Sequence, residues 1–124
     1  WAHEGMGDAE YLAAFDALLM PICRQFSPDL VLVSCGFDAA AGDPLGGMAL
    51  SPLGFAAMAA RLSQLANGRV VYALEGGYKP SVAARCTLAV LRLLVGSPEL
   101  RAVRAAAAAA DLTRPSFARL ARGA

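Results

Sequence analysis

The stretch PDLVLVSCGFDAAAGDPLGGM, residues 28–48, decides the fold of this chain. It begins with a continuous apolar, half β-branched run at residues 30–33, which is the pattern expected of a strand covered on both faces. A second apolar run occupies residues 70–74, and helical patterns precede, separate and follow the two runs. This order predicts an α/β fold with a parallel sheet. Because two parallel strands do not make a stable sheet alone, we expect further strands upstream or from a partner.

Two amphipathic stretches predict the helices beside these strands. In the first, residues 8–26, apolar side chains fall on one helical stripe and Asp8 is the expected N-cap. Pro21 lies inside this pattern and should kink the helix, because proline lacks a backbone N–H and crowds the preceding turn. The second helix is expected to begin after Ser51, an N-cap followed by proline, and to end at Asn67 and the glycine that follows it.

The last part of the chain changes in character. A third helix is expected over about residues 81–95, and an alanine-rich stretch at 100–110 predicts another, because alanine is the best helix former. One last short helix is expected at 116–122. We therefore divide the chain into residues 1–97, which carry the α/β pattern, and a helical tail at 98–124, to which we assign no chemistry.

Length and composition limit the class of protein. The chain has 124 residues, of which 57% are hydrophobic and 17% charged, so it can build a core but holds at most one ordinary domain. A net charge of +1 argues against nucleic-acid binding through a basic field, and no apolar run is long enough to predict a membrane span. Cys23, Cys35 and Cys86 form no CxxC pair, which indicates reduced thiols and an intracellular protein. The first residue is Trp1, so we interpret the start as a cut end, and we expect the single histidine, His3, to lie on the surface.

Two glycine-rich loops leave the predicted strands at their carboxyl ends, at residues 34–48 and 75–78. In open α/β sheets, ligands bind in the crevice beyond this edge. The order of the strands therefore brings Asp38, Asp43 and Tyr78 to one edge of the sheet, which makes this edge the candidate site.

Each of these side chains has a structural and a chemical interpretation. Asp43 stands between a glycine and a proline, a setting that suits either a turn or a carboxylate aimed at a metal ion. Asp38 can cap its loop by an Asx-type bond or act directly in catalysis, and we favour the structural role. Tyr78 can donate a hydrogen bond to developing negative charge or pack under its loop. Gly76 and Gly77 belong to no phosphate-binding motif.

Several segments taken together resemble one family. GMGDAEYLAAF with MPI after it, PDLVLVSCGFDAAAGDPLGGM, SPLGFAAM and GRVVYALEGGY occur in the order and spacing of the zinc-dependent histone deacetylases, specifically the class II branch. The resemblance covers roughly residues 4–96. It implies the three-layer arginase/deacetylase fold, with a central parallel sheet and helices on both faces, of which this chain would hold only the C-terminal portion.

The resemblance also implies roles for individual residues. Asp43 falls on a zinc-binding aspartate of the family and Tyr78 on its catalytic tyrosine. Gly76 and Gly77 match the loop beside the narrow substrate channel. Leu45 falls where lysine deacetylases keep an apolar gatekeeper and polyamine-preferring relatives carry a carboxylate, so the implied substrate is acetyl-lysine on a histone or another protein. Asp38 is then expected to support the loop from a second shell around the metal.

The implied reaction is zinc-dependent amide hydrolysis, in the cytoplasm or the nucleus. A catalytic zinc site needs three protein ligands, and neither the family's Asp-x-His segment nor its histidine pair occurs in these residues. We therefore expect the remainder of the deacetylase domain upstream, and an isolated chain without activity. Two alternatives stay open: a truncated, non-catalytic interaction module that folds on a partner, and an acetylpolyamine amidohydrolase.

Overall fold

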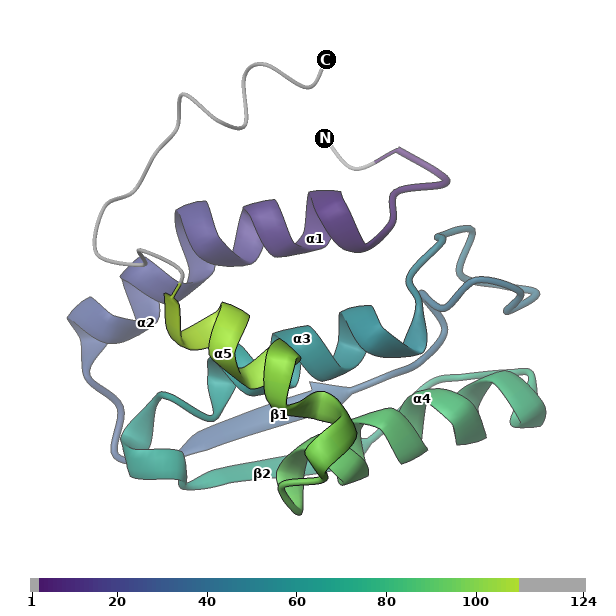
Figure 1. The fold of residues 1–124 in the computed structure, drawn as a ribbon. Coiled ribbons are helices and arrows are strands. Elements are labelled where there is room, and N and C mark those ends of the chain that lie inside the picture. The colour runs from purple at the N-terminus through teal and green to yellow at the C-terminus, as the bar shows by residue number, and fades with distance from the viewer. Residues whose placement is uncertain (1–2, 110–124) are drawn as a thin grey trace.

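The computed structural model describes residues 3–109, and the short helix expected at 116–122 lies outside them (Figure 1). Two strands and a set of helices alternate along the chain in the predicted order. The elements are α1 (Asp8–Ala14), the π-helical segment η1 (Phe15–Leu19), α2 (Met20–Phe26), β1 (Val31–Cys35), α3 (Pro52–Leu62), the 3₁₀ turn η2 (Ala66–Gly68), β2 (Val70–Leu74), α4 (Pro80–Leu94), the 3₁₀ turn η3 (Pro98–Leu100) and α5 (Arg101–Ala109).

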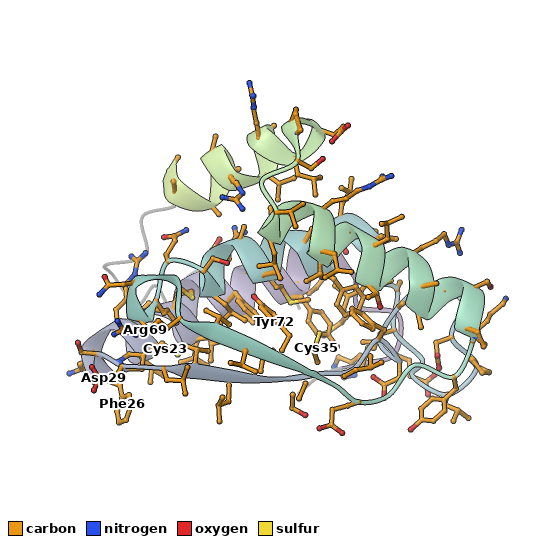
Figure 2. The ribbon with its side chains drawn as sticks, turned by 90° about the horizontal axis from the view of Figure 1, so that it is seen from below. Cys23, Phe26, Asp29, Cys35, Arg69 and Tyr72 are labelled. Atoms are coloured by element: carbon orange, nitrogen blue, oxygen red, sulfur yellow. The ribbon has the colours of Figure 1, made fainter. Side chains whose placement is uncertain are left out.

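The two strands form a parallel sheet, as predicted. Val31 lies opposite Val70, and the register continues to Cys35 opposite Leu74. Side chains alternate between the two faces of a strand, so Val31, Val33 and Cys35 share one face with Val70 and Tyr72. The helices α3, α4 and α5 lie on that side of the sheet, where the labelled side chains of Cys35 and Tyr72 extend toward them (Figure 2). We call this side the covered face.

The core lies between the covered face and the helices. Helix α3 packs against α4, α5 and α1, and the buried side chains join these helices to the start of the loop after β1. A second cluster fixes the end of α3 over β1. The main cluster comprises Phe37, Ala40, Leu50, Phe55, Ala56, Ala59, Ala60, Val82, Cys86, Val90, Leu93, Leu100 and Ala107, and the second comprises Met20, Leu62 and Leu65.

The opposite side of the sheet, which we call the open face, is apolar and exposed. Leu32 is 73% exposed and Val71 52% exposed, although both stand in the middle of a strand. Within residues 3–109 the first strand is covered on one face only, and the second cover that its pattern predicts is not among the described elements. The described helices pack on the covered face only. The apolar residues that predicted a second cover therefore face none of these helices.

Two predicted details of the first helix also differ. The N-cap is Gly7, whose N–H donates to the carboxylate of Glu10 at 2.9 Å. Asp8 is the first helical residue, and its carboxylate instead accepts bonds from the N–H of Ser51 at 2.8 Å and from its hydroxyl at 2.5 Å. The irregularity expected at Pro21 takes the form of the π-helical segment η1 just before it, since the proline offers no N–H to the turn behind it.

The second predicted helix begins as expected and ends early. Ser51 caps α3, since its hydroxyl accepts the N–H of Gly54 at 3.1 Å. The helix ends at Leu62, and Asn67 lies beyond it in η2 with a left-handed φ of 54°. Leu65, predicted on the helix, is instead a buried residue of the connecting turn. The chain then reaches β2 through the turn that contains Leu65 and the 3₁₀ turn η2.

Helices α4 and α5 match the predicted third helix and alanine-rich stretch closely. Leu100 and Ala107, beyond the boundary proposed at residue 97, are buried in the main core, and the division at that boundary stays a prediction. Among the described residues, no single helix is long and apolar enough to cross a membrane. Helix α4 and residues Pro98–Ala109 meet that test only together, across a 90° bend.

Candidate active site

Two loops meet at the carboxyl edge of the sheet, at the right of Figure 1: residues 36–50 after β1 and residues 75–79 after β2. They are joined by backbone bonds that continue the sheet past its last ladder pair. The N–H of Glu75 donates to the carbonyl of Cys35 at 3.2 Å, and the N–H of Phe37 donates to the carbonyl of Gly76 at 2.8 Å. The parallel strands therefore bring the two loops together, as their order predicted.

Phe37 anchors the first loop in the core. Its side chain is only 3% exposed, and its ring meets that of Phe55 edge-on with centroids 5.1 Å apart. The loop then folds back on itself, since Ala40 and Leu50 form a parallel bridge. Phe37 was not among the residues predicted from the sequence, although its place directly after a strand and a glycine is a usable signal for a buried anchor.

Asp43 connects the two loops through its carboxylate. Oδ1 accepts the N–H of Leu45 at 2.9 Å, within the same loop. Oδ2 accepts the N–H of Tyr78 at 2.7 Å, across to the second loop. The backbone N–H of Asp43 itself donates to the carbonyl of Ala40 at 3.0 Å. Backbone and side chain together fix the direction of this carboxylate, whose two oxygens each accept one amide.

These amides also govern the charge of Asp43. Partial burial by itself would raise the pKa of its carboxyl, because burial disfavours the charged form. The N–H groups of Leu45 and Tyr78, which donate to the carboxylate, and the nearby amides of Gly46 and Lys79 act in the opposite direction and together hold the pKa below its ordinary value. The site therefore presents an ionised carboxylate at neutral pH.

Tyr78 lies at the surface of the second loop, with its side chain 58% exposed. It follows Gly77, whose backbone φ of 132° is one that residues other than glycine rarely adopt. A Cβ on Gly77 would also stand 3.2 Å from Cβ of Ala83 and 3.3 Å from Cβ of Phe37. The glycine lets the backbone pass close to α4 and the first loop, and it leaves the phenol free at the rim.

Asp38 lies beside the second loop. Within residues 3–109 its carboxylate forms no Asx-type hydrogen bond; instead, a Cβ on Gly76 would stand 2.6 Å from its Oδ2. Asp38 thus occupies the space that the missing side chain of Gly76 leaves. Gly46, which was not predicted from the sequence, is needed for a similar reason, because a Cβ there would overlap the carbonyl oxygen of Asp38. Its signal was the pair of glycines at the end of GDPLGG.

Of the remaining predicted residues, Leu45 lies at the candidate site and His3 lies away from it. Leu45 is 70% exposed on the first loop, next to Asp43 in the chain. His3 is exposed near the start of the chain, as expected. In the part of the chain that the structure describes, no group of three His, Cys, Asp or Glu side chains could hold a metal ion. Asp43 offers one ionised oxygen donor of fixed direction with lone pairs left over, and a catalytic zinc site needs three protein ligands.

Comparison with solved structures identifies the fold. The crystal structure of the HDA15 HD domain superposes with a TM-score of 0.76 at 41% sequence identity, covering 79% of this chain and 28% of that one. The α/β architecture is therefore that of a histone deacetylase catalytic domain, and this chain corresponds to a part of it.

Comparison with known sequences gives the family. The family model described as histone deacetylase domain matches residues 1–94. The chain is 48% identical over 98 residues to histone deacetylase clr3 of Schizosaccharomyces pombe, covering 79% of this chain and 14% of that protein. It is 46% identical over 98 residues to polyamine deacetylase HDAC10 of Mus musculus, covering 79% of this chain and 15% of that one. The chain belongs to the histone deacetylase family, and it spans only about a seventh of these relatives.

Proposed function

We propose that this chain forms one wall of a zinc-dependent deacetylase site that hydrolyses N-acetyl-lysine amides on histones or other proteins. The observation that carries the proposal is the contact between Asp43 and Tyr78, where a carboxylate of fixed direction lies one hydrogen bond of 2.7 Å from the backbone of an exposed tyrosine. Family membership supports the deacetylase chemistry. The position of both residues beyond the carboxyl ends of the parallel strands supports the location of the site.

Asp43 is proposed to supply one of the three protein ligands that a catalytic zinc needs. When bound, zinc supplies a Lewis acid that polarises the amide carbonyl and lowers the pKa of a water. The residues of this chain prepare that role in two ways. Their amides keep Asp43 ionised, as its lowered pKa indicates, and they fix the direction of both carboxylate oxygens.

Tyr78 is proposed to donate its phenolic hydrogen to the oxygen of the acetyl carbonyl as negative charge develops there. Its exposure at the rim supports this role, because a side chain that contacts substrate has to reach outward from the loop. Gly76 and Gly77 are proposed to line the channel beside it, where their lack of side chains leaves room for a narrow substrate. Asp38, packed against Gly76, supports this loop from behind.

Leu45 favours acetyl-lysine over a polyamine. An exposed apolar side chain beside the carboxylate offers a contact to the methylene stem of lysine, and it offers no charge to attract a second ammonium group. The acetylpolyamine alternative still has a specific observation behind it, because one of the matched relatives is a polyamine deacetylase. Turnover of an acetyl-lysine peptide and of an N-acetylpolyamine by the same preparation separates the two.

The proposed partner of this chain is the rest of a deacetylase domain. The open face supports it, because parallel sheets are ordinarily buried on both faces and Leu32 and Val71 are more than half exposed. The non-catalytic alternative makes a different prediction for the upstream reading frame. An Asp-x-His segment and a histidine pair there support an intracellular deacetylase, and their absence supports an interaction module.

The experiment that tests the proposal replaces Tyr78 in the complete domain. Loss of one oxyanion hydrogen bond costs roughly a hundredfold to a thousandfold in turnover, so we expect Tyr78→Phe to lower kcat on an acetyl-lysine peptide by at least about a hundredfold. The matched control is Tyr72→Phe, which removes the hydroxyl of a half-buried tyrosine under α3, 3.4 Å from the carbonyl of Ala59, and should retain most turnover. Near-normal turnover in Tyr78→Phe would remove Tyr78 from its assigned role.

A further inference from the structure

The bond between Asp43 and Tyr78 exceeds what a turn requires. An aspartate in a turn commonly accepts the N–H two residues ahead, and the contact of Oδ1 with the N–H of Leu45 is such a bond. The contact of Oδ2 is different, because it reaches the N–H of a residue 35 positions away, on another loop. Turn chemistry accounts for the first contact and leaves the second without a reason.

The backbone of Tyr78 depends on this contact. It follows Gly76 and Gly77, so the stem of the loop has wide conformational freedom. Upstream, the last backbone bond between the loops joins Gly76 to Phe37. Downstream, α4 begins at Pro80 and its first turn is closed by the N–H of Val82 on the carbonyl of Lys79. Between these two fixed points, the hydrogen bond to Asp43 holds the peptide that carries the tyrosine side chain.

Resting on the proposed function, we propose that Asp43 is also the positioning residue for Tyr78: its Oδ2 holds the N–H of Tyr78 and so directs the phenol over the carboxyl edge of the sheet. An ionised carboxylate has about four acceptor positions, and the two amides take one on each oxygen. One position on each oxygen stays available to a metal ion. A single carboxylate can therefore bind a metal and hold the tyrosine at the same time.

This arrangement couples the two halves of the site. Outer hydrogen-bond partners orient a metal-binding side chain, and the N–H of Tyr78 acts as such a partner of Asp43. Coupling of this kind is reciprocal. If ordering of the tyrosine loop strengthens metal binding by some factor, then metal binding favours the ordered loop by the same factor. The proposed coupling therefore runs through one hydrogen bond, from the N–H of Tyr78 to Oδ2 of Asp43.

The test measures the amide of Tyr78 in the isotopically labelled 124-residue chain, kept free of metal with a chelator. Asp43→Ser is the decisive variant, since its hydroxyl can still accept the N–H of Leu45 in a turn but is too short to reach the second loop. A hydrogen bond to a charged group is worth enough to slow exchange about tenfold or more. We expect hydrogen exchange at Tyr78 to accelerate at least about tenfold in Asp43→Ser, while Leu45 and Val82 change by less than about threefold.

Two further variants complete the design. Asp43→Ala should release both Leu45 and Tyr78, and Asp38→Asn, which alters the neighbouring carboxylate that accepts neither amide, should leave both unchanged. Unchanged exchange at Tyr78 in Asp43→Ser and Asp43→Ala overturns the proposal, as does equal acceleration at Tyr78 and Val82, which means general unfolding. The measurement needs neither zinc nor turnover, so it can fail while Tyr78→Phe still abolishes activity, and the reverse.

Discussion

The two faces of the sheet have the same apolar character and opposite surroundings. On the covered face, Val33 and Tyr72 pack against side chains of the core, whereas on the open face Leu32 and Val71 remain exposed. Both sets come from the same two strands and alternate along them. The difference therefore reflects where the helices of this chain lie. The covered face supports the fold of the described residues, and the open face is where we propose that another part of a deacetylase domain binds.

The largest expected effect lies where the covered face meets the candidate site. Phe37→Ala removes a ring that is 3% exposed and packed on Phe55, and deletions of this kind cost about 3–5 kcal/mol. Such a loss is comparable to much of the stability of a small domain. Urea unfolding followed by circular dichroism measures the loss. The control is Leu32→Ala on the open face, for which we expect less than about 1 kcal/mol. Equal losses in the two variants would remove the distinction between the faces.

A second effect concerns the ion pair that joins the first helical stretch to α3. Arg61 is buried, and its guanidinium binds Asp16 through Nε–Oδ1 at 2.5 Å and Nη2–Oδ2 at 2.8 Å. The Asp16 side chain is 26% exposed, so solvent screens part of the interaction, and we expect Asp16→Ala to cost about 2 kcal/mol.

The matched control for the ion pair is the double variant Asp16→Ala with Arg61→Met. Removing both partners leaves no buried charge uncompensated, so the double variant should be more stable than Asp16→Ala alone in the same unfolding experiment. A double variant that is less stable than the single one would mean that Arg61 contributes through packing and through its bond to the carbonyl of Ala57 instead.

A smaller effect appears at alkaline pH, and it arises beneath the covered face. Burial raises the pKa of Cys35 and Cys86 above their ordinary 9.0 and that of Tyr72 above 10.0, because a charged form is disfavoured there. The folded chain then keeps protons that the unfolded chain releases, so this part of its stability is present below about pH 9 and is lost as the pH rises through the raised values.

The alkaline loss can be assigned with one substitution. Unfolding free energies measured from pH 7 to pH 10.5 should decline, and the decline should be smaller in Cys35→Ala, which removes one of the titrating groups. A decline of the same size in the variant would mean that Cys35 does not contribute to it. Cys35, Tyr72 and Cys86, whose pKa values burial raises, lie on the covered face or in the core beneath it, so this pH dependence belongs to that side of the sheet.

The sequence predicted what depends on local pattern. Apolar runs identified both strands, and a serine followed by proline identified the start of α3, because these signals act over a few neighbouring residues. It missed what depends on distant partners. Asp8 resembles an N-cap, yet its carboxylate binds Ser51, 43 residues away. The end of α3 was placed too late, since Asn67 and its glycine are equally suited to the turn that follows the helix.

The same limit applies to the candidate site. Strand order sufficed to bring Asp43 and Tyr78 to one edge, because parallel strands point their carboxyl ends the same way. The hydrogen bond between them has no sequence signal, since the two residues are 35 positions apart and the contact depends on how the loops fold back. The sequence indicated a second cover for the first strand but not where that cover comes from, because a hydrophobic strand looks the same whether its second cover belongs to these residues or to others.

The smallest expected effect on stability is on the open face itself, and the same substitution separates folding from assembly. Leu32→Lys places a charge on a side chain that is 73% exposed, so the stability of the isolated chain should change by no more than about 0.5 kcal/mol. If the rest of a deacetylase domain binds the open face, as we propose, the same lysine would have to be buried there, which is costly. We therefore expect Leu32→Lys to unfold like the parent chain and to lose deacetylase activity when the two parts are combined, measured as reconstituted turnover. Arg69→Lys, which keeps the charge of the residue just before β2, should reconstitute normally. If Leu32→Lys reconstitutes as well as the parent chain, then the open face is not where the rest of the domain binds.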